Sequence, residues 1–255
     1  MKPELSSVEL AILFASIGRQ LASFDRTDTV FRALCATAVE RVPGGEFAGV
    51  TIGRDGAFKT VGATSDLVHK ADRIQYDLRS GPCVEAIVHD TVFDTPDLRS
   101  DRRWPEFGRQ AFDATGIVSM LSLRLYVEND HAVVAALNMY STQPAAFGEP
   151  AATIALLLAT HGAIAVSNAA ARERAANLEK ALENSREIGV AMGIVMHQQK
   201  TTRDQAFDLL RIASQHTHRK IAEIAAEVAD TGQLPNLPLR TSETRATGNG
   251  KAASR

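Results

Sequence analysis

Apolar residues near the N-terminus of the chain recur every three or four positions, from Ser6 to about Val42. An acidic break at Asp25 and Asp28 interrupts this spacing. Helical periodicity with one interruption predicts two helices in this region. Their apolar positions are Leu10, Leu13, Phe14, Ile17 and Leu21, then Val30, Leu34 and Ala38.

Short β-like runs follow these helices, at residues 47–52, 58–61, 117–126 and 132–140, and Gly-rich or polar turns separate them. Such runs predict an antiparallel sheet. Helical segments lie between the middle runs, one starting near Gly81 and Pro82 and another from about Trp104 to Ala114. The mixture of strands and helices predicts an α+β domain.

From about Ala151 to Lys200 the sequence is Ala-rich and lacks Pro, which predicts one long connecting helix over 151–199. Within it, residues at alternating steps of four and three form a heptad seam, hereafter the seam. Its members are Leu157, His161, Ile164, Asn168, Ala171, Ala175, Leu178, Leu182, Ser185, Gly189, Met192 and Met196. A heptad seam predicts a coiled coil, and a buried Asn such as Asn168 fixes the register of such coils. The alternative is a helix that packs on its own domain.

Two short helices are predicted after Lys200. Thr202 and Gln205 have the spacing of a capping box, which marks a helix start. Apolar stripes at Ala206, Leu209, Leu210 and Ala213, and then at Ile221, Ile224, Ala225 and Val228, identify the two helices. Gly232 and Pro235 end the second one. The tail over 236–255 has no periodicity, and we expect it to be disordered.

Composition changes this picture little. The 255 residues are 45% hydrophobic and 23% charged, as in ordinary globular proteins, and the length suits two domains. We identify neither a signal peptide nor a long enough apolar run for a membrane span, and two cysteines make no disulfide framework. We therefore expect a cytoplasmic protein. The net charge of −2 means that any binding of nucleic acid must be local.

The segment from Ser185 to His197, SREIGVAMGIVMH, together with AFDLLRIAS at 206–214 and the stripe from Ile221 to Val228, resembles the ANTAR family of RNA-binding output domains. The match covers residues 178–234. The resemblance implies a three-helix module that binds paired stem-loops in leader transcripts and prevents formation of a transcription terminator. It therefore implies an antitermination regulator with RNA stem-loops as partners.

Positive charge is concentrated locally in this module. From His197 to Lys220, five cations stand against two acidic residues, and we expect the charge to gather where the last two helices meet. On a helical projection, Ser214 and Phe207 flank the stripe of core residues, where they suit phosphate contact and base stacking. The predicted RNA-binding residues are Lys200, Arg203, Phe207, Arg211, Ser214, Arg219 and Lys220. The alternatives are a solvated basic face and a half-buried Phe207.

A second resemblance covers residues 27–168. It rests on the segments SGPCVEAI at 80–87, VFDTPDL at 92–98, RWPEF at 103–107, Gly116-Ile117 and AALNMYS at 135–141, which resemble a GAF sensory domain. It implies an antiparallel sheet around a pocket for an unknown small ligand, and flanking helices that mediate dimer contacts. With the N-terminal helices, this domain spans 1–168, and it overlaps the connecting helix. No cofactor is expected.

Candidate pocket residues are Arg79, Cys83, Asp94, Arg103 and Trp104. Cys83 follows Pro82 at a predicted helix start, where the helix dipole favours a thiolate, so redox sensing is one interpretation and a buried inert thiol is the other. Some GAF proteins reduce free methionine sulfoxide with cysteines, and only Cys35 is left as a second thiol for such chemistry.

We expect a signal-responsive RNA binder, not an enzyme, that forms a homodimer through the long helix. A DNA-binding regulator is the first alternative, disfavoured because Glu223 and Glu227 point outward from the last helix. A thiol-based methionine sulfoxide reductase is the second. No metal is expected, because His197, His216 and His218 lack a Cys or acidic group at ligand spacing. No membrane contact is expected either.

Overall fold

The computed structural model describes residues 6–89, 92–125 and 134–235. The chain divides into two compact units, Met1–Ala175 and Ala176–Arg255, and each is considered by itself. The expected tail over 236–255 lies outside the described residues, as do residues 126 and 132, which the sequence placed at two strand ends.

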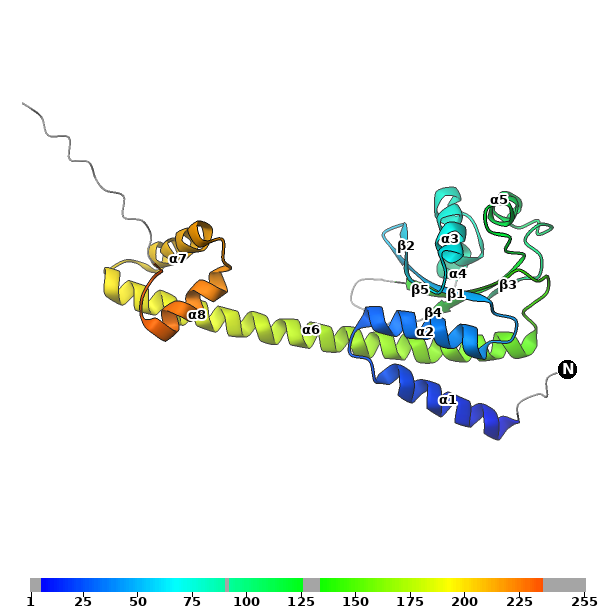
Figure 1. The fold of residues 1–255 in the computed structure, drawn as a ribbon, viewed down its shortest axis with the longest axis horizontal. Helices are drawn as coiled ribbons and strands as arrows, with labels where there is room; N and C mark the ends of the chain where they lie inside the picture. The colour runs from blue at the N-terminus through cyan, green and yellow to red at the C-terminus, as the bar shows by residue number, and fades with distance from the viewer. Residues whose placement is uncertain (1–5, 90–91, 126–133, 236–255) are drawn as a thin grey trace, which may run out of the picture. The chain divides into compact units, whose positions relative to one another are not determined.

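The first unit has an α+β fold, as expected (Figure 1). Its strands form one antiparallel sheet in the order β2-β1-β5-β4-β3. The strands are β1 (Phe47–Arg54), β2 (Ala57–Ala63), β3 (Phe93–Thr95), β4 (Ser119–Leu125) and β5 (Val134–Ser141). The helices are α1 (Ser7–Ala22), α2 (Thr27–Arg41), α3 (Asp66–Leu78), α4 (Pro82–His89), α5 (Pro105–Thr115) and the first part of α6 (Glu149–Gln199).

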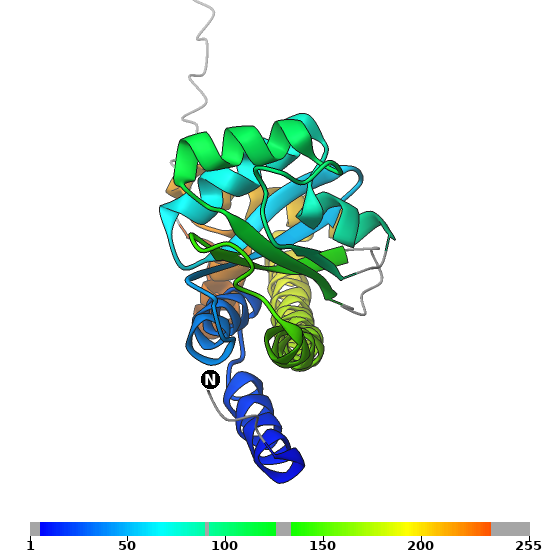
Figure 2. The same cartoon turned by 90° about the vertical axis from the view of Figure 1, so that its right-hand side faces the viewer.

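Helices cover both faces of the sheet, as Figure 2 shows. Because side chains alternate along a strand, Leu137 and Met139 of β5 enter a core with α1, α2 and α6, whereas Ala136 and Tyr140 enter a second core with α3, α4 and α5. Aliphatic residues, chiefly Ala, Leu and Val, fill most of the first core. The sheet therefore separates two cores that share no side chains.

Two elements of this unit were missing from the sequence prediction. Helix α3 buries Val68 and Ala71 but also Asp72 and Gln75, so its buried face is half polar and its apolar period is weak. Strand β3 has three residues, fewer than a pattern of alternation requires. Both elements belong to the core on the α3–α5 side of the sheet.

Helix α6 is continuous over Glu149–Gln199. The first unit buries the face of α6 that carries Ala155, Leu158 and Ala169. The seam lies on the opposite face, where Ile164 is 54% exposed and Leu178 is 61% exposed. Helix α6 thus packs on its own domain, and the face it uses leaves most of the seam exposed.

By length and composition α6 also qualifies as a helix that could cross a membrane, and among the described residues it alone does so. Half of its most apolar window is buried inside the protein. This pattern is the one expected of a helix that belongs to a domain core.

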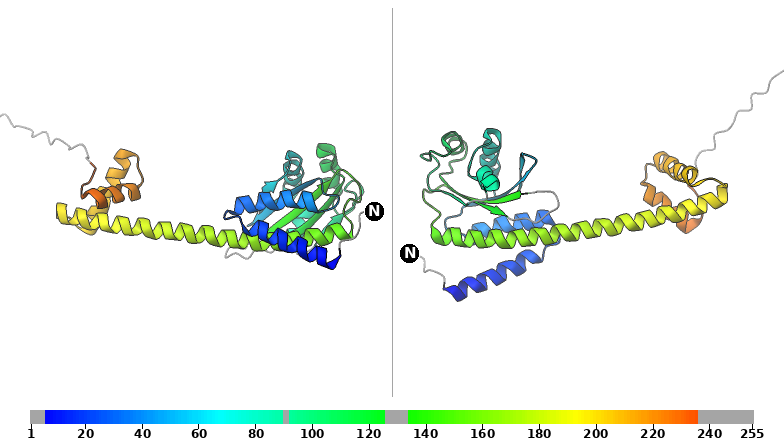
Figure 3. Two further views of the ribbon diagram at one scale, coloured as in Figure 1. Left: turned by 60° about the horizontal axis from the view of Figure 1, so that its bottom comes forward. Right: turned by 180° about the vertical axis from the view of Figure 1, so that it is seen from behind.

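The second unit is a three-helix module made by the end of α6 with α7 (Arg203–Thr217) and α8 (Ile221–Thr231) (Figure 3). The predicted capping box starts α7, where the Thr202 hydroxyl accepts from Gln205 N and Gln205 Oε1 accepts from Thr202 N. Gly232 ends α8 in the left-handed conformation. The module has its own core of Ala191, Met192, Val195, Ala206, Leu210, Ala213, Ile224, Ala225 and Val228.

Candidate functional site

A buried polar network lies between the sheet and helices α3 and α4, where an apolar core would be the simpler arrangement. We refer to it as the polar network. Six members are fully buried and two are partly buried. Its members are Thr51, Thr60, Asp72, Gln75, Tyr76, Cys83, Asn138 and Tyr140.

Hydrogen bonds connect the polar network from strand to strand. Asp72 accepts from the Tyr140 hydroxyl and from Thr60 Oγ1, the latter at 2.7 Å. The Tyr76 hydroxyl lies 2.7 Å from Thr51 Oγ1 and 2.9 Å from Thr60 Oγ1. The network therefore ties α3 to three strands, β1, β2 and β5.

Asp72 is the carboxyl group at the centre of this network. Its burial raises its pKa from 3.8 to about 6, although the hydroxyls of Tyr140 and Thr60 act in the opposite direction by stabilising the carboxylate. The net rise shows that loss of water outweighs these hydrogen bonds. The group is thus positioned to change its charge near neutral pH.

Three buried polar atoms next to or within the network have no hydrogen-bond partner among the described residues: Gln75 Nε2, Asn138 Oδ1 and Ser122 Oγ. Asn138 and Ser122 are register partners on β5 and β4, so their side chains share one face of the sheet. Unsatisfied buried polar atoms cost about 1–3 kcal/mol each. A donor and two acceptors in one buried region suit a small polar ligand or ordered water.

Cys83 belongs to the polar network and is fully buried. Its backbone N–H donates to Gln75 Oε1 at 2.8 Å, and Asn138 Nδ2 lies 3.0 Å from its sulfur. Burial and the nearby Asp72 raise the pKa of the Cys83 thiol to about 12. Of the two interpretations of Cys83, its burial favours the inert thiol, because loss of water opposes the thiolate more strongly than the helix terminus stabilises it.

Cys35 is the second thiol of the chain, and it lies on the other side of the sheet. It belongs to the core formed by α1, α2 and α6, whereas Cys83 belongs to the core formed by α3, α4 and α5. Burial also raises the pKa of Cys35 to about 12. The two sulfurs are thus not arranged as an attacking and a resolving thiol.

The remaining candidates for the sensor pocket lie in other surroundings. Arg103 donates to Asp101 and, at 2.9 Å, to the carbonyl of Asp94, and its guanidinium lies 4.4 Å from the centre of the Trp104 ring. Trp104 Nε1 donates to Glu85 at 2.9 Å. Asp94 and Arg103 are exposed and Trp104 is buried in the core, and together the three join β3 to α4 and α5.

Arg79 ends α3 in the left-handed conformation, with φ at 51°, and its side chain is exposed. The structure places only Cys83 of the five predicted pocket residues in the polar network. The sequence reasoning missed Asp72, Asn138 and Tyr140. A polar residue at an inward-facing position of an otherwise apolar strand could have indicated this network. Asn138 in the segment AALNMYS is such a residue.

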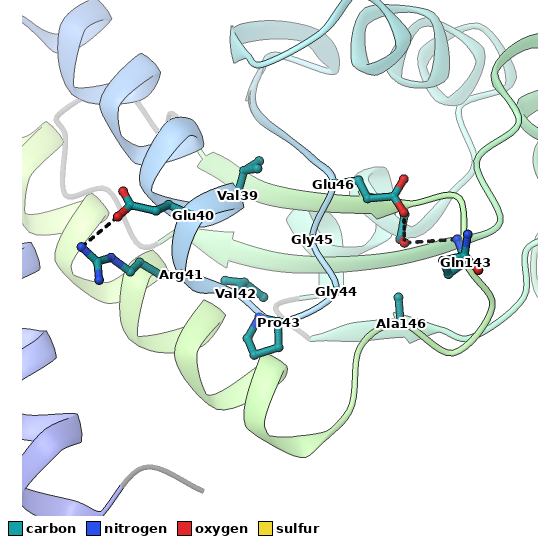
Figure 4. Close-up of a pocket in the computed structure, with 11 residues that line it drawn as sticks. Val39, Glu40, Arg41, Val42, Pro43, Gly44, Gly45, Glu46, Gln143 and Ala146 are labelled. Carbon is teal, nitrogen blue, oxygen red and sulfur yellow. Dashed lines mark hydrogen bonds and ion pairs between the residues drawn. The ribbon is translucent and has the colours of Figure 1, made fainter. Parts of the chain in front are cut away.

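A surface pocket of about 420 Å³ lies where α2 turns into β1, near the end of β5 (Figure 4). Its acidic group, Glu46, already accepts hydrogen bonds from Thr142 and Ser141, which lower the pKa of the carboxyl although burial acts against them. None of the residues predicted from sequence lines this pocket. The acidic group of this pocket is thus satisfied without a ligand.

In the second unit, the predicted RNA-binding residues follow one side of α7. Arg203, Phe207, Arg211 and Ser214 are spaced four, four and three residues apart, which makes them neighbours along roughly 17 Å of helix. Lys200 precedes the helix and Arg219 follows it. The charge therefore extends along α7, and the expectation that it gathers where α7 meets α8 is wrong, because Lys200 and Arg203 lie at the other end.

The predicted RNA-binding cations differ in whether they form ion pairs within the chain. Arg219 binds Glu227 at 2.5 Å and Glu223 at 3.7 Å, and Arg211 binds Asp208 at 2.9 Å. In the described part of the chain, Lys200, Arg203 and Lys220 are exposed and have no ion-pair partner. These three side chains remain available for phosphate contacts.

Phe207 and Ser214 complete the predicted set. Phe207 is 39% exposed, so its ring is accessible for stacking. Ser214 donates to the carbonyl of Arg219 at 2.5 Å, which joins the end of α7 to the turn before α8. The exposed ring suits a base, whereas Ser214 contributes to the turn that positions Lys220.

The metal-binding alternative has no geometric support in the described residues. Within 6–89, 92–125 and 134–235, no three His, Cys, Asp or Glu side chains are placed to share an ion. His197, His216 and His218 are each exposed.

Comparison with known families assigns both units. The model of the GAF domain matches residues 26–167, more than half of the chain, and the model of the ANTAR domain matches residues 176–228. The chain is a GAF domain family member with an ANTAR domain. Both resemblances noted in the sequence are confirmed. A GAF domain indicates a sensor, and an ANTAR domain indicates RNA-binding regulation.

Solved structures of similar fold align with the GAF domain of this protein. One is the type II free methionine-R-sulfoxide reductase of Thermoplasma acidophilum, with 19% identity and a TM-score of 0.44 over 57% of this chain and 94% of that chain. Another is the GAF domain of a phosphoenolpyruvate-protein phosphotransferase of Coxiella burnetii, with 13% identity and a TM-score of 0.48 over 64% and 96%. No curated protein matches the chain.

Proposed function

We propose that this GAF-ANTAR protein is a signal-responsive transcription antitermination regulator. Its ANTAR domain binds stem-loops in leader transcripts, and the chain acts in the cytoplasm as a homodimer through α6. The observation that carries the proposal is the row of exposed cations along α7 with an accessible ring at Phe207. Phosphate contacts supply most of the affinity for a nucleic acid, and aromatic side chains stack on the unpaired bases of an RNA loop.

DNA is a less suitable partner. A DNA-reading helix must approach the phosphates closely, and α8 carries Glu223 and Glu227 on its exposed surface. Both glutamates lie beside Arg219 and neutralise it. The acidic surface of α8 therefore disfavours duplex DNA, whereas the cations of α7 remain accessible to an RNA loop.

A thiol reductase is also less suitable. Reduction of a sulfoxide by cysteine needs an accessible thiolate and a second thiol to resolve the oxidised one. Cys83 is fully buried with a raised pKa, and Cys35 lies in the core on the other face of the sheet. These features support a regulator in which the GAF domain senses and does not catalyse.

The polar network supports a sensory role for the GAF domain. A ligand that satisfies Gln75, Asn138 and Ser122 stabilises the conformation in which α3 and α4 cover the sheet, and a ligand shifts a conformational equilibrium only if it binds two states unequally. We propose a small polar ligand for this site. The substitution Asn138→Ala removes one of the polar groups of this ligand site and leaves the ANTAR domain unchanged.

RNA binding is tested by titrating labelled stem-loop RNA and duplex DNA of equal length with the full chain over a range of salt concentrations. RNA binds more tightly than DNA on this proposal. Arg203→Ala and Lys220→Ala each weaken RNA binding and reduce the slope of log K against log salt by about 1.

Lys59→Ala is the matched control, since Lys59 is an exposed cation on β2 in the GAF domain. It is expected to leave both affinity and slope unchanged. Equal affinity for RNA and DNA, or unchanged slopes in both ANTAR variants, contradicts the assignment of α7 as the RNA-binding surface.

A further inference from the structure

Within the polar network, a continuous series of hydroxyl groups joins Asp72 to Asn138. Thr60 Oγ1 lies 2.7 Å from Asp72 Oδ2. The Tyr76 hydroxyl lies 2.9 Å from Thr60 Oγ1 and 2.7 Å from Thr51 Oγ1, and Thr51 Oγ1 lies 3.2 Å from Asn138 Nδ2. We call these three linked hydroxyls, of Thr60, Tyr76 and Thr51, the hydroxyl chain.

The charge of Asp72 fixes the direction of every hydrogen bond in the hydroxyl chain, because each hydroxyl has a single hydrogen to donate. A carboxylate only accepts, so Thr60 donates to Asp72. Thr60 then has no hydrogen left for Tyr76, so Tyr76 donates to Thr60. By the same count Thr51 donates to Tyr76 and accepts from Asn138 Nδ2. All hydrogens of the chain therefore point toward Asp72 while it is charged.

A proton on Asp72 must be donated to one of two neighbouring oxygens. The Tyr140 hydroxyl is a poor acceptor, because it is buried and among the described residues it bonds to Asp72 alone, so its own hydrogen would lose its partner. Thr60 accepts if each hydroxyl of the chain turns its hydrogen to the next. This reversal ends at Thr51, whose hydrogen then points at Asn138 Nδ2, which is a donor and cannot accept.

Asn138 can remove this conflict by turning its side-chain amide over. Its Oδ1 has no partner among the described residues, and after the turn it accepts from Thr51. The same position lies 3.0 Å from Cys83 Sγ, whose S–H can then donate to Oδ1 as well. Ser122, the register partner of Asn138, has a free hydroxyl oxygen that can accept from Nδ2. Because the amide oxygen and nitrogen exchange places, the backbone does not have to move.

We propose that the polar network is a proton switch, in which protonation of Asp72 reverses the hydroxyl chain and turns the amide of Asn138. One proton enters from solvent and stays on Asp72. Every other hydrogen remains on its own residue and only changes direction.

The other titratable groups near Asp72 leave it as the group that operates the switch. They come from α3, β5, α4 and α2, whereas β1 and β2 contribute the uncharged Thr51 and Thr60, and they are His69, Tyr76, Tyr140, Cys83 and Cys35. Burial raises the pKa values of both tyrosines and both cysteines, so these four stay neutral. The pKa of Asp72 is about 6, and His69 is exposed.

The switch changes what the proposed ligand site presents. While Asp72 is charged, Asn138 offers the free acceptor Oδ1, and once Asp72 is neutral it offers hydrogens of Nδ2 in the same place. A ligand held there through its own N–H group therefore binds more tightly at high pH, and one held through a carbonyl or carboxylate oxygen binds more tightly at low pH. This consequence rests on the ligand of the proposed function, whereas the switch itself does not.

Nuclear magnetic resonance of the full chain, without RNA or ligand, tests the switch. With 15N in asparagine side chains and 13C in aspartate carboxyls, the Asn138 amide signal is expected to shift with the same pH midpoint as the Asp72 carboxyl. Asn138→Ala identifies the amide signal by its loss. Thr60→Val and Tyr76→Phe each interrupt the hydroxyl chain, so in both variants Asp72 still titrates and the Asn138 signal no longer follows it.

Tyr140→Phe is the matched control, because like Thr60→Val it removes one hydroxyl donor from Asp72 but leaves the hydroxyl chain intact. Both variants move the Asp72 midpoint to higher pH, and only in Tyr140→Phe does the Asn138 signal move with it. His69→Gln leaves the shared midpoint in place. An Asn138 signal that ignores pH in the unmodified chain, or that still follows Asp72 in Thr60→Val, overturns the proposal. Neither result depends on RNA binding, so the proposed function stands or fails separately.

Discussion

Asp72 is a carboxyl whose burial governs how the GAF domain responds to pH. Its pKa is about 6 in the folded protein and 3.8 without the fold, so the folded state holds the proton more tightly. The stability that this group contributes is present below about pH 4 and is lost as pH rises to about 6. The difference between the folded and unfolded pKa values corresponds to about 3 kcal/mol of stability.

Asp72→Asn is therefore expected to remove this pH dependence. Denaturant unfolding of both proteins at pH 4 and pH 7 measures it. The free energy of unfolding of the wild type, measured relative to that of the variant, should decrease from pH 4 to pH 7. An unchanged difference would show that Asp72 titrates as an ordinary carboxyl.

Cys83 is expected to be unreactive in the folded protein. Its thiol is buried, and its pKa is raised to about 12, so the thiolate that reacts is scarce at neutral pH. Reaction with a chromogenic disulfide reagent should be on the order of 100-fold slower in buffer than in denaturant. Rapid labelling of the native protein would instead favour redox sensing through this residue.

Gly193 of α6 is an exposed glycine inside a helix, and a Cβ at this position would have no atom within 4 Å. Gly189, four residues earlier, has the same open space, so no described part of the chain packs closely against either glycine. Glycine destabilises a helix by roughly 1 kcal/mol relative to alanine. Because glycine has no side chain, it would allow a bound molecule to approach the helix backbone closely at this position.

Gly193→Ala is expected to raise the free energy of unfolding by up to about 1 kcal/mol and to weaken RNA binding. Gly189→Ala is the matched control, since Gly189 has the same open space above it but occupies a seam position. It should stabilise the helix and leave RNA affinity unchanged. Wild-type RNA affinity in both variants would place the RNA contact elsewhere.

The elements differ in how far their sequences determine them. Strands β4 and β5 were predictable because Leu121, Leu123 and Leu137 belong to apolar runs, and the start of α7 was predictable because Thr202 and Gln205 form a capping box. Helix α3 was not, because its buried face includes Asp72 and Gln75. The polar network follows from tertiary contacts between four distant segments, and local patterns cannot reveal such contacts.

At the scale of the whole molecule, α6 connects the two domains, so its helical phase is expected to matter for how two copies bind RNA. Seven residues advance a helix by nearly two turns and return the seam to the same side within roughly 20°, whereas two residues rotate it by roughly 200°. A duplicate of residues 176–182 inserted after Leu182 therefore extends the seam, and an Ala-Ala insertion at the same point interrupts it.

We expect the seven-residue insertion to keep the dimer and its affinity for RNA with two stem-loops. The two-residue insertion should weaken the dimer and lower that affinity by about tenfold or more, because the second stem-loop loses the high effective concentration that a linked module provides. A single stem-loop serves as the control, since it needs only one ANTAR module and should bind both proteins equally. Equal binding of the two-stem RNA by both insertion variants would mean that each module acts alone, independently of the phase of α6.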